Sequence, residues 1–142
     1  MGEVVAICIS EKKGTEKNTV NECTVIENHG IKGDAHAGNW HRQISLLSYE
    51  KIEDFKNRGV NVEDGAFGEN LIIKGIDFSE IIVGSKVQIG QVLLEVTQLG
   101  KKCHQHCRIY EAVGDCIMPR EGVFAIALVG GEILVGEKVN LL

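Results

Sequence analysis

Two of the five cysteines of this 142-residue chain, Cys103 and Cys107, lie in a basic stretch that runs from Lys101 to Arg108. The stretch contains two lysines, two histidines and one arginine. Neighbouring positive charges stabilise a thiolate relative to the thiol, so a cysteine here is expected to ionise readily. The thiolate is the form that acts as a nucleophile, carries sulfur or binds a soft metal.

Cys103 is the better candidate for this chemistry, because it stands between Lys102 and His104 just after a predicted strand, and functional groups concentrate in loops on rigid scaffolds. Cys107 is explained equally well as a packing residue of a short amphipathic turn with Ile109. A redox-active pair of the two thiols remains an alternative. A zinc site is another, although the spacing differs from the usual zinc knuckles. Its ligands would come from Cys103, His104, His106, Cys107 and Cys116.

A second group of polar residues lies between Gly30 and Arg42. Three glycines in the segment Gly30–Gly38 let the backbone approach a ligand closely. The cations and hydrogen-bond donors of this group are Lys32, His36, His41 and Arg42. The combination suits an anionic, oxygen-rich ligand such as a phosphate, although each histidine taken singly is more often an ordinary loop residue. The glycine spacing is neither that of a Walker loop nor that of a dinucleotide fingerprint.

Two further turns carry polar residues. In the segment Asp64–Leu71, Glu69 and Asn70 would orient a ligand through their carboxylate and amide groups. On composition alone, this segment is equally well explained as a glycine-bracketed turn with a solvated glutamate. The segment Gly114–Gly122 contains the only proline, which fixes a bend. Composition therefore predicts a turn there and no particular site.

The elements that must position these residues are mostly strands. β-Branched and apolar segments bounded by glycines and charged residues predict nine of them. They are Val4–Ile9, Cys23–Glu27, Gln43–Leu47, Asn70–Lys74, Lys86–Ile89, Val92–Gln98, Gly122–Val129, Glu132–Val135 and Lys138–Leu141. Two dipeptides, Gly90-Gln91 and Gly130-Gly131, each predict a type II′ hairpin between the flanking strands.

One helix is predicted over Tyr49–Arg58, with Ser48 as its N-cap and Gly59 just after its end. The charged segment Glu11–Asn18 is the best candidate for a mobile loop. Strands joined by tight turns favour a mainly β fold, an antiparallel barrel-like single domain over residues 1–142 with one or two short helices.

The charge and hydropathy of the chain exclude several classes of protein. A net charge of −5 argues against nucleic acid or an anionic membrane as a partner held by a broad basic surface. The longest apolar run, Val123–Val129, is far shorter than the roughly 20 residues of a membrane span. An odd number of cysteines and no signal-peptide pattern argue against a disulfide scaffold and make the cytoplasm the expected location.

Several of these segments together resemble the MOSC domain, named after the C-terminal domain of molybdenum cofactor sulfurases. The resemblance keeps its order over nearly the whole chain and is closest to the small stand-alone bacterial type. The matching segments are Gly33–Gly38, Arg42–Leu47, Phe67–Leu71, Val92–Gln98 leading to Cys103, Gly114–Gly122 and Gly130–Glu137.

The resemblance implies a barrel-like β fold and a reactive cysteine that carries a persulfide or ligates the molybdenum of a bound molybdopterin cofactor. It places this role, catalytic and as molybdenum ligand, on Cys103. The residues that it implies for cofactor binding are Lys32, Asp34, His36, Arg42, Glu69, Asn70 and Lys101. The expected partners are a pyridoxal-phosphate cysteine desulfurase as sulfur donor and molybdopterin-synthesis enzymes. A non-catalytic zinc or docking module that associates with those enzymes is the alternative.

Overall fold

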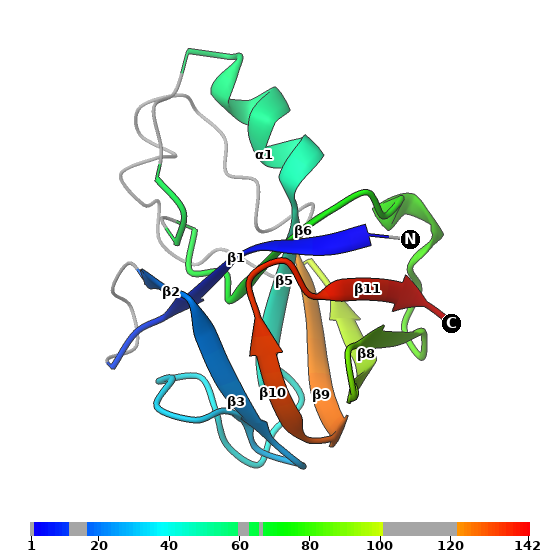
Figure 1. Ribbon diagram of the computed structural model, residues 1–142. Coiled ribbons are helices and arrows are strands. Elements are labelled where there is room, and N and C mark those ends of the chain that lie inside the picture. Colours follow the sequence, from blue (N-terminus) through cyan, green and yellow to red (C-terminus); the bar gives the residue numbers. More distant parts are fainter. Residues whose placement is uncertain (1, 12–16, 60–62, 66, 101–121) are drawn as a thin grey trace.

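Eleven strands and two short helices make up the described part of the chain, residues 2–11, 17–59, 63–65, 67–100 and 122–142 of a computed structural model (Figure 1). The strands are β1 (Gly2–Ile9), β2 (Asn18–Val20), β3 (Glu22–Ile26), β4 (Gly30–Ile31), β5 (Ile44–Ser48), β6 (Leu71–Lys74), β7 (Lys86–Ile89), β8 (Val92–Leu99), β9 (Val123–Val129), β10 (Gly131–Leu134) and β11 (Lys138–Leu141). The helices are α1 (Tyr49–Lys56) and the 3-10 turn η1 (Phe78–Glu80). The prediction of a mainly β fold is confirmed.

Seven of these strands close into a barrel. Hydrogen-bonded neighbours follow the order β11-β7-β8-β9-β5-β6-β1, and β1 returns to β11 to complete the ring. The closing pair places Gly2 opposite Val139 and Glu3 opposite Lys138. Six of the seven pairs are antiparallel, whereas β5 and β6 run parallel. The predicted antiparallel barrel therefore contains one parallel pair.

A parallel pair needs a crossover connection, and α1 supplies it between β5 and β6. Ser48 caps the helix, since its Oγ accepts a hydrogen bond from the backbone N–H of Lys51 at 3.4 Å. Ile52 and Phe55 are the buried residues of the helix. The predicted helix is confirmed, and it ends at Lys56, two residues earlier than expected.

Two apolar layers hold these elements together. The first fills the barrel, and the second lies between the barrel wall and α1. Side chains alternate along a strand, so β5 gives Leu46 to the first layer and Leu47 to the second, and the strand is buried on both faces. Cys23 belongs to the first layer and Cys8 to the second, so both buried thiols act as packing residues.

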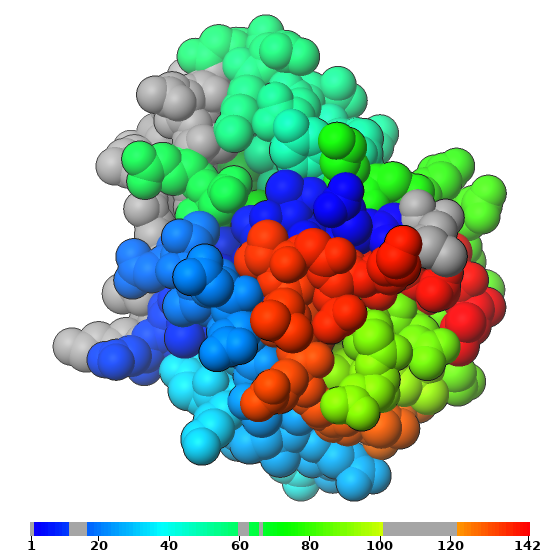
Figure 2. Space-filling model, in the orientation of Figure 1, coloured from blue at the N-terminus to red at the C-terminus, as the bar shows by residue number. Residues whose placement is uncertain are grey.

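Strands β10, β3 and β4 form a separate three-stranded sheet, whose strands β3 and β10 lie at the front of the view (Figures 1 and 2). Because β10 pairs with β3 and not with β9, the hairpin predicted at Gly130-Gly131 is wrong. The chain crosses there from the barrel to the second sheet. A Cβ atom on Gly130 would lie 2.6 Å from the backbone oxygen of Val25, so this crossing needs a glycine.

The other strand predictions agree with the structure to within two residues, and the Gly90 turn does join the paired strands β7 and β8. Two short strands, β2 and β4, were not predicted. β2 begins at Asn18, the last residue of the predicted mobile loop; residues 12–16 of that loop lie outside the described residues, and Lys17 is buried. No helix in the described part of the chain is long and apolar enough to cross a membrane.

Candidate functional site

The polar residues of the candidate site lie at one end of the barrel. Strand register places Gln98 of β8 opposite Phe124 of β9, and Phe124 opposite Ser45 of β5. On the other side of the parallel pair, Asn70 just precedes β6 and donates its backbone N–H to the backbone oxygen of Ser45 at 3.1 Å. The backbone N–H of Cys8 in β1 donates to the backbone oxygen of Asn70 at 2.7 Å. Five barrel strands therefore meet at one polar rim.

A buried lysine lies beyond the end of β1. The Nζ atom of Lys17 lies 2.7 Å from Asp34 Oδ1, 3.2 Å from Ser10 Oγ and 2.9 Å from His36 Nδ1. The side chains of Lys17 and Asp34 are fully buried, whereas that of His36 is 32% exposed. We refer to Ser10, Lys17, Asp34 and His36 as the Lys17 cluster. A charged group is tolerated in a protein interior where it is paired and hydrogen-bonded, as Lys17 is here.

Asp34 is held by the backbone as well as by the lysine. Its Oδ1 accepts the backbone N–H of Ser10 at 3.1 Å, and its Oδ2 accepts that of His36 at 3.2 Å. Gly33, which precedes it, has φ +86°, a conformation that glycine adopts without strain. The Gly-Asp-Ala-His sequence therefore forms a tight loop whose aspartate ties β1, the Lys17 side chain and His36 together.

The segment from Gly65 to Glu69 packs against the same lysine. The backbone N–H of Lys17 donates to the backbone oxygen of Gly65 at 3.0 Å. Glu69 is fully buried, and its two oxygens accept the backbone N–H groups of Gly65 and Phe67, each at 3.1 Å. Burial raises the pKa of Glu69 to about 7, although the backbone hydrogen bonds act in the opposite direction.

Asn70 ties three strands of the rim. Its Oδ1 accepts the backbone N–H of Ser45 at 2.9 Å and the Ser45 hydroxyl at 3.2 Å, while its Nδ2 donates to the backbone oxygen of Cys8 at 3.1 Å. Asn70 and Glu69 thus both bind the protein's own backbone. The structure gives them a positioning role at this end of the barrel.

Arg42 lies between two aromatic rings. The guanidinium carbon is 4.7 Å from the ring centroid of Trp40 and 5.6 Å from that of Phe124, within the range of cation–π attraction. The buried Nε atom of Arg42 has no hydrogen-bond partner within the described residues. We refer to Trp40, Arg42 and Phe124 as the Arg42 stack.

Trp40 connects the Arg42 stack to the Lys17 cluster, because its Nε1–H donates to the backbone oxygen of His36 at 2.7 Å. On the other side, His41 contacts Gln98 of β8 through Nε2 and Oε1 at 2.8 Å. The Thr97 hydroxyl donates to the backbone oxygen of His41. The rings of Trp40 and His41 meet edge to face, with their centroids 5.6 Å apart, so hydrogen bonds and ring contacts together connect the Lys17 cluster to the end of β8. We refer to this set of contacts as the rim network.

The segment that contains the predicted cysteine starts and ends at this network. β8 and β9 pair up to Leu99 and Val123, and the backbone N–H of Gly100 donates to the backbone oxygen of Gly122 at 2.7 Å. Cys103 and Lys101 lie between these anchors, outside the described residues. Within the residues that are described, no group of three His, Cys, Asp or Glu side chains is arranged to hold a metal ion.

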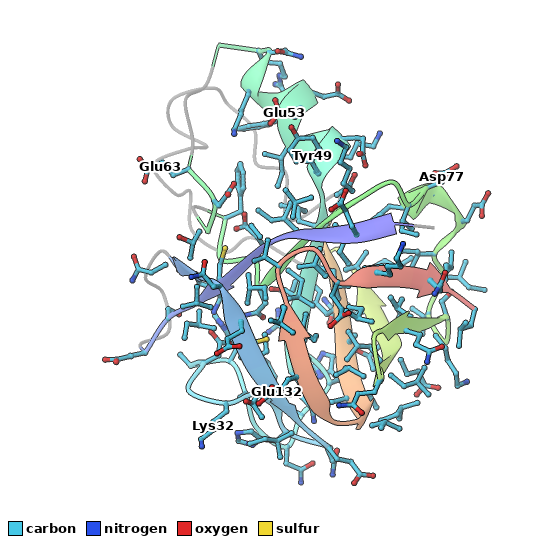
Figure 3. All side chains as sticks on the ribbon, in the orientation of Figure 1. Lys32, Tyr49, Glu53, Glu63, Asp77 and Glu132 are labelled. Atoms are coloured by element: carbon cyan, nitrogen blue, oxygen red, sulfur yellow. The ribbon has the colours of Figure 1, made fainter. Side chains whose placement is uncertain are left out.

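The structure brings together most of the other predicted site residues. Asp34 and His36 share the Lys17 cluster, Glu69 and Asn70 support the rim beside it, and Arg42 lies in the adjoining stack. Lys32 does not join them: it is exposed and points away from the molecule (Figure 3).

Sequence reasoning missed Lys17, Trp40 and Gln98. Lys17 stands in a charged segment that resembles a solvated loop, and its partner Asp34 is 17 residues away along the chain.

The fold and the site together define a closed β-barrel with a polar, cation-bearing rim at the end where β8 and β9 open into a long connection. The sequence pattern of the MOSC domain matches residues 33–140, and the chain belongs to this family. The family is associated with molybdenum cofactor sulfurase-like proteins. None of the curated proteins matches the sequence.

Solved structures share the fold. The YuaD protein from Bacillus subtilis is 18% identical with a TM-score of 0.81, and the match covers 98% of this chain and 94% of that one. YiiM from Geobacillus stearothermophilus is 20% identical with a TM-score of 0.75, covering 100% and 75%. YiiM from Escherichia coli is 18% identical with a TM-score of 0.67, covering 99% and 69%. At these identities the likeness establishes the fold alone.

Proposed function

We propose that the protein handles sulfur or the molybdenum cofactor, with Cys103 as the reactive thiolate. The main support for this proposal is the position at which the segment that contains Cys103 is anchored to the barrel. Gly100 and Gly122 are hydrogen-bonded at the rim, next to Gln98 and the Arg42 stack. Three residues of chain span about 10 Å at most, so Cys103 is tethered within that distance of Gly100.

In the sulfur-carrier form, the Cys103 thiolate attacks the outer sulfur of a donor persulfide. A new S–S bond forms at Cys103, the donor's S–S bond breaks, and the donor leaves as a thiolate. An acceptor nucleophile later removes the outer sulfur and restores the Cys103 thiolate. A pyridoxal-phosphate cysteine desulfurase supplies persulfide sulfur of this kind and is the proposed donor.

In the cofactor form, the same rim binds molybdopterin. The residues fit the polar edges of such a group, because the buried Arg42 Nε donor has no partner within the described chain and an anionic oxygen would satisfy it. His36 and His41 would add hydrogen bonds from the neighbouring loop. When bound, the cofactor supplies a molybdenum centre for which a thiolate is a suitable soft ligand.

Sulfur transfer is tested with a cysteine desulfurase and isotope-labelled cysteine. We expect the wild-type protein and Cys107→Ser to acquire label and a mass increase of about 32 Da, one sulfur atom. Cys103→Ser should acquire neither, with an unchanged thermal unfolding midpoint. Labelling of Cys103→Ser at the wild-type level would refute the assignment of Cys103.

The cofactor form is tested by elemental analysis and pterin fluorescence of protein purified without an affinity tag. Molybdenum and a pterin should co-purify with the wild type, and much less with Arg42→Gln. Stoichiometric zinc in place of molybdenum would instead support a metal-binding docking module, and its removal by a chelator would then unfold the protein.

A further inference from the structure

The buried ammonium group of Lys17 has a complete set of partners. An ammonium group has three N–H donors and accepts no hydrogen bond. Lys17 Nζ lies within hydrogen-bond distance of Asp34 Oδ1 at 2.7 Å, His36 Nδ1 at 2.9 Å and Ser10 Oγ at 3.2 Å. Each of these three atoms can accept, so one N–H is directed at each.

This arrangement determines where His36 carries its proton. A neutral imidazole has one N–H donor and one acceptor nitrogen, and the bond made by one nitrogen fixes the state of the other. Because Nδ1 receives a hydrogen bond from the Lys17 ammonium, the ring proton must sit on Nε2. We propose that Lys17 is a positioning residue that holds His36 as the neutral Nε2–H tautomer.

The other charged group of the cluster agrees with this assignment. Asp34 Oδ2 lies 4.0 Å from His36 Nδ1, farther than the lysine nitrogen, and it already accepts the backbone N–H of His36. Asp34 Oδ1 lies 2.7 Å from Lys17 Nζ, so this ion pair is balanced without a charge on the imidazole. A second positive charge at His36 would stand directly against the buried ammonium.

The tautomer of His36 determines which hydrogen-bonding group this loop presents to a ligand. The sequence suggested that His36 contributes a cation, whereas the structure places the buried cation on Lys17 and leaves His36 as a neutral donor. Its ring is 32% exposed, and Trp40 fixes its backbone from the side of the Arg42 stack. His36 Nε2–H therefore suits an acceptor atom, such as a persulfide sulfur or a cofactor oxygen. This last step rests on the proposed function; the tautomer does not.

The tautomer is read from long-range 1H–15N spectra of the full chain labelled with 15N-histidine, near pH 7.5. His36 is assigned by comparison with His36→Gln, and the exposed ring of His41 serves as reference. We expect a non-protonated Nδ1 and a protonated Nε2 for His36. A protonated Nδ1 in the wild type would overturn the proposal without any variant.

The Lys17→Met variant tests whether Lys17 determines the tautomer of His36. Without the ammonium, the Asp34 carboxylate becomes the nearest partner of His36 Nδ1, so the signal should change to a protonated Nδ1. An unchanged spectrum in a folded Lys17→Met would refute the role of Lys17. If this variant does not fold, Lys17→Met/Asp34→Asn removes both buried charges, and it should show a mixture of the two tautomers; retention of the pure Nε2–H form would count against the proposal.

The donor role is tested separately through sulfur loading of Cys103. His36→Leu removes the donor and should lower loading by about tenfold or more, as expected for a hydrogen bond to a charged acceptor. His36→Gln keeps an N–H group and should lower loading less. Equal losses would refute the donor role. Absence of loading in the wild type would instead refute the proposed function and leave the tautomer result standing.

Discussion

Glu69 is a buried carboxyl group that the fold surrounds with backbone. Its oxygens accept hydrogen bonds from the backbone N–H groups of Gly65 and Phe67, and its own backbone N–H also interacts with the carboxylate. Its pKa is raised from 4.5 to about 7, first by desolvation, and the nearby Asp64 adds to the effect. The folded protein therefore holds this proton more tightly than the unfolded chain does.

This difference predicts the pH dependence of stability. The stabilisation is fully present below pH 4.5, falls as the pH rises, and is lost above about 7. At about 1.36 kcal/mol per pKa unit, it amounts to roughly 3 kcal/mol. Urea unfolding between pH 4.5 and 8 should show a flatter dependence in Glu69→Gln than in the wild type. Glu63→Gln, an exposed change in the same loop, should leave the dependence unchanged; equal slopes for all three proteins would contradict the assignment.

The buried thiols lead to a second prediction. Burial raises the pKa of Cys8 to about 12 and that of Cys23 to about 11, so neither is ionised near neutral pH. In native protein at pH 7.5, iodoacetamide should leave both unmodified while it alkylates Cys103. Peptide mass spectrometry against a urea-unfolded control measures the protection. Modification of Cys8 or Cys23 at the unfolded rate would contradict the burial of these thiols.

Single residues also show what could be predicted from the sequence. The roles of Cys8 and Cys23 follow from their apolar strands, and Asp34, His36 and Glu69 stand out by their type and their glycine neighbours. Lys17 could not be predicted, because a buried lysine and a solvated lysine look alike until the fold supplies a partner. The carboxylate that pairs with Lys17 comes from a different loop.

At the level of elements, local signals predicted most strands and α1. The alternation of apolar and polar residues in a strand and the capping residues of a helix both lie close together in the sequence. Pairing was harder. Gly130-Gly131 has the composition of a hairpin turn, yet β10 pairs with β3, more than 100 residues earlier in the chain. A close approach of two backbones and a tight turn both select glycine, so the residue type alone does not distinguish them.

Glycines around the loop that precedes β6 provide a test at this level. Gly65 and Gly68 both have positive φ, +91° and +80°. A Cβ atom on Gly65 would lie 2.0 Å from the backbone oxygen of Lys17, whereas one on Gly68 meets nothing within 4 Å. Gly68→Ala should cost about 1 kcal/mol through its backbone conformation alone.

Gly65→Ala should cost about 1–3 kcal/mol more than Gly68→Ala, because the backbone of Lys17 must move to relieve the clash. Urea midpoints at constant m-value measure the difference. Gly65→Ala should also shift the NMR signals of His36, since the buried lysine moves with its backbone. Equal destabilisation by the two variants would mean that Gly65 does not hold Lys17 in place.

At the level of the whole molecule, the barrel depends on a pairing between its first and last strands. β1 meets β11 at Gly2 and Val139, and Val139 is only 1% exposed. The pairing has the largest sequence separation in the barrel, and nothing in either strand alone indicates it. A barrel could be predicted from many short strands, but the position of its seam could not.

Removal of the closing strand should therefore abolish cooperative folding. Deletion of residues 138–142 leaves β1 and β7 with unpaired edges and opens the core to water. We expect loss of the near-ultraviolet circular dichroism signal and binding of a hydrophobic dye. Deletion of Leu142 alone, a residue 68% exposed, should preserve a two-state transition. A cooperative transition in the longer deletion would show that the barrel is stable when open.

The hydrogen bond between Gly100 and Gly122 has a consequence for how this protein can diversify. Both ends of the intervening segment are already fixed by the pairing of β8 with β9, so lengthening the segment adds only about 0.6 kcal/mol of closure entropy per doubling. Closure entropy therefore sets only a weak limit on the length of the chain between these two glycines. The paired ends of β8 and β9 can hold segments of different length and composition at this rim without a change in the barrel itself.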